Sequence, residues 1–91
     1  MAQASSEAVV VTLPADVDLH ARPAADFVRA ALALAADVRV AAGEREADAK
    51  SLLSVLALGA KGGTELRLTA TGEDAAAALD ALSARIATLS D

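Results

Sequence analysis

The segment TELRLTAT, from Thr64 to Thr71, alternates polar and apolar residues from Glu65 onward. Successive side chains of a β-strand point to opposite faces, so such alternation is typical of a strand with one buried face. We therefore predict a strand here. The residues expected to face the core are Leu66, Leu68 and Ala70, and those expected to face outward are Glu65, Arg67 and Thr69.

Three further segments have the composition of strands. VVVTL (Val9–Leu13) is short and rich in β-branched residues, and Pro14 closes it. VRVAA (Val38–Ala42) and EREADAK (Glu44–Lys50) are predicted to be two strands joined at Gly43. The second of these is polar enough to be expected at the edge of a sheet.

Helical spacing appears in three places. From Pro23, which suits the first turn of a helix because it needs no amide hydrogen there, one predicted face holds Phe27, Ala31 and Leu34, with Val28, Leu32 and Ala35 beside it. Ser51 is the predicted N-cap of a short apolar helix that reaches Leu58. A last helix is expected from about Asp74, with the apolar stripe Leu79, Leu82, Ile86 and Leu89.

The predicted order of elements is therefore β-α-β-β-α-β-α. This is a split βαβ arrangement with one extra helix, which favours an α+β fold: an open-faced sandwich of a four-stranded antiparallel sheet covered on one face by three helices. No linker or repeat divides the chain. Residues 1–7 are expected to be a short polar tail, and residues 8–91 a single domain.

Composition excludes several classes of function. The net charge is −5 and the chain has no Trp or Tyr, which argues against nucleic-acid binding. It has no Cys and one His, so a disulfide framework or a metal site is not expected. The start, MAQASSEA, lacks the features of a signal peptide, and the longest purely apolar stretch, Ala30–Ala36, is far too short to span a membrane. We expect a cytoplasmic protein without membrane insertion.

The only histidine, His20, precedes a predicted helix start and is followed by Arg22 and Pro23. The first amides of a helix lack partners within the helix and attract anions, phosphate above all. Arg22 adds a guanidinium that matches phosphate oxygens, and neutral imidazole is a nucleophile. From these residues alone, two interpretations stay open: ordinary polar surface residues, or a phosphohistidine site.

Two separated motifs resemble a known family. LHARPAADFV (Leu19–Val28) and KSLLSVLALG (Lys50–Gly59) are similar to HPr, the family of histidine-containing phosphocarriers of the phosphoenolpyruvate-dependent sugar phosphotransferase system. The likeness covers nearly the whole chain and includes TGEDAAAALDAL, which enters the last predicted helix. One departure is Asp18, which stands where the family pattern normally has glycine.

The resemblance implies a function and its residues. His20 would accept a phosphoryl group from enzyme I and pass it to EIIA components of sugar transporters, Arg22 would stabilise the group, and Pro23 would start the helix. Such a carrier has no turnover of its own, needs no cofactor, and is expected to be a monomer. The alternative within the family is a regulatory or interaction module with little or no sugar-transport flux.

The family also implies roles for the second motif. Ser51, besides capping a helix, corresponds to the serine that an HPr kinase/phosphorylase modifies in some bacteria. Leu52, Leu53 and Leu56 would form an apolar docking patch beside His20, with Lys50 and Arg29 as a basic rim. Other small folds fit less well: an acylphosphatase-like enzyme needs an asparagine, which is absent, and an acyl carrier protein has Asp before its serine, where this chain has Lys50.

Overall fold

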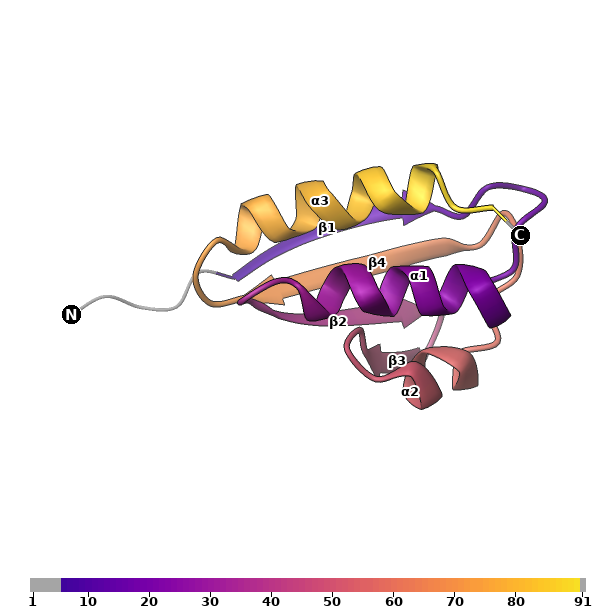
Figure 1. Ribbon diagram of the computed structural model, residues 1–91, viewed down its shortest axis with the longest axis horizontal. Coiled ribbons are helices and arrows are strands. Elements are labelled where there is room, and N and C mark those ends of the chain that lie inside the picture. Colours follow the sequence, from indigo (N-terminus) through magenta and orange to yellow (C-terminus); the bar gives the residue numbers. More distant parts are fainter. Residues whose placement is uncertain (1–5, 91) are drawn as a thin grey trace.

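A computed structural model describes residues 6–90 and contains four strands and three helices in the order β-α-β-β-α-β-α (Figure 1). The predicted fold class is therefore confirmed. The elements are β1 (Ser6–Thr12), α1 (Ala21–Leu32), β2 (Asp37–Ala42), β3 (Arg45–Asp48), α2 (Leu52–Ala57), β4 (Glu65–Thr71) and α3 (Ala75–Ala87).

The alternating segment forms β4, from Glu65 to Thr71, and this strand has a neighbour on each side in the sheet. The strand order is β1-β4-β2-β3, and every neighbouring pair is antiparallel. Leu68 pairs with Val9 on one side and with Val40 on the other. β3 is an edge strand, as its polarity predicts.

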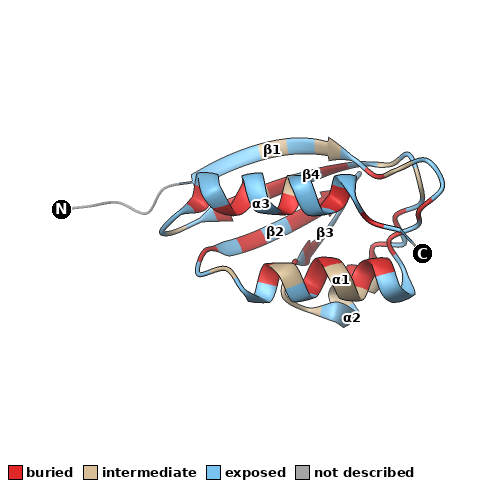
Figure 2. Ribbon diagram, turned by 45° about the horizontal axis from the view of Figure 1, so that its top comes forward, coloured by how far each residue is buried: buried red, intermediate tan, exposed pale blue. Residues whose placement is uncertain are grey.

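The core lies between the sheet and the helices on one of its faces (Figure 2). α3 packs over β1 and β4, α1 lies beside α3, and α2 packs against α1 and β3. Phe27, Leu66, Leu68 and Leu82 are completely buried. The predicted inward residues of β4 are all buried, so the alternation places the core on the expected face.

The apolar face of α1 differs from the prediction. Leu32 is 60% exposed and Ala35 is also exposed, whereas Pro23 and Ala24 are buried with Phe27, Val28 and Ala31. A helix turns about 100° per residue, so Leu32 lies about 40° beyond Val28 at the edge of the buried stripe, where the packing of α1 leaves it exposed. The helix also ends at Leu32, and Leu34, in the following turn, is half-buried.

Several predicted boundaries also shift. β1 begins at Ser6, so the last two residues of the expected tail belong to the sheet, while residues 1–5 lie outside the described part of the chain. β3 covers only Arg45–Asp48 of the expected Glu44–Lys50. Leu89 is buried as predicted, but it lies beyond the end of α3. No helix among residues 6–90 is long and apolar enough to cross a membrane.

Candidate phosphohistidine site

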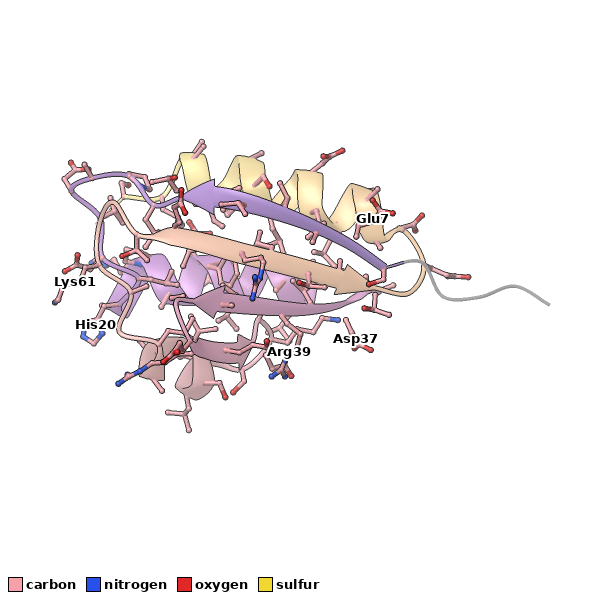
Figure 3. All side chains as sticks on the ribbon, turned by 180° about the vertical axis from the view of Figure 1, so that it is seen from behind. Glu7, His20, Asp37, Arg39 and Lys61 are labelled. Carbon is pink, nitrogen blue, oxygen red and sulfur yellow. The ribbon has the colours of Figure 1, made fainter. Side chains whose placement is uncertain are left out.

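His20 is the N-cap residue of α1. Its backbone is extended (φ −144°, ψ 162°), and its side chain makes no capping hydrogen bond. The imidazole is exposed at one end of the molecule (Figure 3). His20 directly precedes the first amides of a 12-residue helix, which have no acceptors within that helix.

Backbone hydrogen bonds join the loop before His20 to the loop before β4. The Leu19 amide donates to the Ala60 carbonyl at 2.9 Å, the Leu13 amide to Thr64 at 3.0 Å, and the Gly63 amide to Leu13 at 3.1 Å. Gly62 permits this close approach, since a Cβ there would collide with the carbonyl of Ala15. The residue immediately before His20, Leu19, is therefore held in place by a distant part of the chain.

Asp18 adds a side-chain hydrogen bond to the same junction. Its Oδ1 accepts from the Gly62 amide at 2.8 Å. The φ of Asp18 is not positive, so the backbone at this position does not require the glycine of the family pattern. The carboxylate instead fastens the two loops to each other.

The residues after His20 combine an unusual backbone conformation with a buried anchor. Ala21 has a φ of +46°, in the left-handed region that costs a residue with a Cβ about 1–2 kcal/mol. Pro23 is buried and lies in the first turn of α1. The buried Pro23 therefore fixes the start of α1 two residues after the strained backbone of Ala21.

A hollow of about 240 Å³ adjoins the imidazole. It is lined by Asp18, Leu19, His20, Leu56, Gly59, Ala60 and Lys61. Lys61 lies in the glycine-rich segment GAKGG (Gly59–Gly63), and no spacing in the sequence links it to His20. The structure brings the two residues together because the loops are hydrogen-bonded to each other.

Arg22 and Arg29 line a second hollow, along α1, together with Ala25, Asp26 and Ser90. Both arginines are exposed, and neither makes an ion pair or side-chain hydrogen bond within residues 6–90. Asp26 between them lies 3.4 Å from Arg85 of α3. Two guanidinium groups are thus available along one helix on an otherwise acidic protein.

The residues of the second motif lie on and before α2. Leu53 is 81% exposed and Leu52 is 41% exposed, whereas Leu56 is half-buried against the core and lines the hollow of His20. The two leucines at the start of α2 therefore do not pack inward. They leave apolar surface on the same short helix that supplies Leu56 to the hollow.

Ser51 is the N-cap of α2, as predicted. Its Oγ accepts from the Ser54 amide at 3.3 Å and lies 3.1 Å from Ser54 Oγ. Lys50 is half-buried, and its ammonium donates to the Leu34 carbonyl at 2.7 Å. The Lys50 charge is therefore fixed just after the end of α1.

Comparisons with known proteins agree with this arrangement. The model of the family described as "PTS HPr component phosphorylation site" matches residues 6–88. The chain is 42% identical over 79 residues to phosphocarrier protein HPr of Haemophilus influenzae, covering 87% of this chain and 93% of that protein. It is 47% identical over 70 residues to HPr of Streptomyces coelicolor, covering 76% and 75%. The crystal structure of HPr from Bacillus anthracis superposes with a TM-score of 0.86 at 32% identity, covering 90% of this chain and 98% of that one.

Proposed function

The chain belongs to the HPr family, the phosphocarriers of the phosphotransferase system, and we propose that it carries a phosphoryl group on His20 from enzyme I to EIIA components of sugar transporters. The observation that carries this proposal is the exposed imidazole at the N-terminus of α1, whose ring makes no capping hydrogen bond. A nucleophile in this position can reach a donor on a partner and has anion-binding amides beside it.

The transfer step needs few groups. A lone pair on the ring nitrogen of neutral His20 that faces the helix start forms a bond to phosphorus. The bond between phosphorus and the donor atom of enzyme I breaks, and its electron pair remains on that atom. Arg22, exposed and two residues away, stabilises the phosphoryl oxygens as they pass. Positioning and charge do most of the work in phosphoryl transfer, so a carrier can manage with these few residues.

We propose that partners dock on α2 and on the charged side chains of Arg29 and Lys50. Leu52 and Leu53 present apolar surface, and Leu56 extends it to the hollow of His20. Arg29 supplies an exposed guanidinium, and Lys50 supplies a charge fixed at the end of α1. Such a basic rim steers acidic partner surfaces toward the histidine. We propose that the protein acts in this way as a cytoplasmic monomer.

Ser51 gives the same surface a regulatory position. A phosphate on its hydroxyl, added by an HPr kinase/phosphorylase, would bring roughly −1.5 to −2 charge next to Leu52 and Leu53. It would also lie near the Ser54 amide, which already donates to the Ser51 hydroxyl. We propose that this modification weakens docking without unfolding the helix.

Intact-protein mass spectrometry at mildly alkaline pH tests the transfer. The protein is incubated with phosphoenolpyruvate and a catalytic amount of enzyme I, beside a His20→Ala variant. We expect one phosphoryl group on the wild type, lost on brief acid treatment, and none on the variant. If the native enzyme I transfers nothing, the carrier function is wrong and the regulatory module is favoured instead.

A further inference from the structure

Lys61 shares the hollow of His20. One wall of this hollow comes from the segment before α1 and the other from residues of α2 and the loop that follows it. Figure 3 shows His20 and Lys61 at the same end of the molecule. The hollow, of about 240 Å³, has room for a phosphoryl group.

The ammonium of Lys61 has no competing partner in the part of the chain that the structure describes. Four other cations are engaged there: Arg39 with Glu46, Arg85 with Asp26, Arg45 with the Ala57 carbonyl, and Lys50 with the Leu34 carbonyl. Lys61 is exposed, and neither a carboxylate nor a carbonyl of residues 6–90 binds it. Its charge is available to an anion in the hollow.

The backbone on both sides of Lys61 is held to the His20 loop. Ala60 accepts from the Leu19 amide at 2.9 Å, and the Gly62 amide donates to Asp18 Oδ1 at 2.8 Å. These bonds keep the Cα of Lys61 close to the His20 loop. The flexible four-carbon side chain lets the ammonium adjust its position to a bound group. Arg22, by contrast, lines a different hollow.

We propose that Lys61 is a second phosphoryl-binding residue, whose ammonium lies against the phosphoryl oxygens when His20 is phosphorylated. This inference rests on the proposed function and adds a residue to its site. It also accounts for the carboxylate of Asp18 in the same hollow. The positive charge of Lys61 offsets the repulsion that Asp18 would exert on the dianionic phosphoryl group.

The equilibrium of phosphoryl transfer tests this role. Purified phosphorylated protein is mixed with unphosphorylated enzyme I in the absence of pyruvate and phosphoenolpyruvate, and mass spectrometry gives the phosphorylated fraction of both proteins at equilibrium. A residue that only docks the partner changes the rate and leaves this equilibrium unchanged. The variants are Lys61→Gln and, as a matched loss of one exposed positive charge, Arg67→Gln on the outward face of β4.

We expect Lys61→Gln to shift the equilibrium about two- to fivefold toward phosphorylated enzyme I, the effect typical of one exposed charge pair. Arg67→Gln should leave it unchanged, and added salt should reduce the difference. An unchanged equilibrium in Lys61→Gln, even with slower transfer, would overturn the proposal, as would an equal shift in both variants. A wild-type chain that enzyme I never phosphorylates would instead contradict the proposed function, and this role with it.

Discussion

Asp18→Gly restores the residue that the family pattern normally has at this position, and we expect it to destabilise this protein. The substitution removes the hydrogen bond from the Gly62 amide to Asp18 Oδ1, which joins two loops 44 residues apart in the sequence. It brings no relief of backbone strain, because φ at Asp18 is not positive.

The expected loss of unfolding free energy in Asp18→Gly has two parts. A hydrogen bond to a charged group contributes about 1.5–3 kcal/mol, and the lower value applies because Asp18 is exposed. Glycine also gives the unfolded chain more conformational freedom, which costs about 0.4–1 kcal/mol. We expect the free energy of unfolding to fall by about 2–2.5 kcal/mol. With a urea m-value of about 1.5 kcal/mol per molar, the midpoint falls by roughly 1.5 M.

Asp16→Gly is the matched control. Asp16 lies in the same loop, is exposed, has no positive φ, and makes no side-chain hydrogen bond within residues 6–90. The Asp16→Gly variant should lose only the free energy of unfolding that comes from the greater freedom of glycine in the unfolded chain, about 0.4–1 kcal/mol. Because the chain has no Trp or Tyr, unfolding is followed by far-ultraviolet circular dichroism. Equal losses in the two variants would refute the stabilising role of the Asp18 hydrogen bond.

Three further perturbations test other parts of the site. Leu53→Ala should change the free energy of unfolding by less than about 0.5 kcal/mol, since the side chain is 81% exposed. It should nevertheless slow phosphoryl transfer from enzyme I, measured by quench-flow. An unchanged transfer rate would remove Leu53 from the docking patch. Ser51→Ala should cost about 1 kcal/mol in urea unfolding through the lost N-cap, and Ser51→Asp should cost less because it keeps an acceptor. Ala21→Gly should raise Tm, because relief of the left-handed conformation, about 1–2 kcal/mol, exceeds the entropy cost of glycine, about 0.4–1 kcal/mol; a lower Tm would show that this conformation carries no strain.

Local patterns in the sequence predict much of this protein. The alternation of Thr64–Thr71 determines which face of β4 is buried, since side-chain direction in a strand depends only on parity. Ser51 is recognisable as an N-cap, because a cap bonds within its own helical turn. His20, Arg22 and Pro23 lie within four consecutive residues, so the sequence alone identifies them as a candidate site.

Tertiary structure decides what depends on contacts between distant segments. β4 is an interior strand of the sheet, and Leu32 is exposed. Both follow from how the elements pack against one another, which local periodicity does not predict. The same holds for Lys61 and for the Asp18–Gly62 hydrogen bond, whose two residues lie 44 positions apart. A lysine in a glycine-rich turn carries no sequence signal of its own, and it becomes a candidate ligand only because folding places it in the hollow of His20.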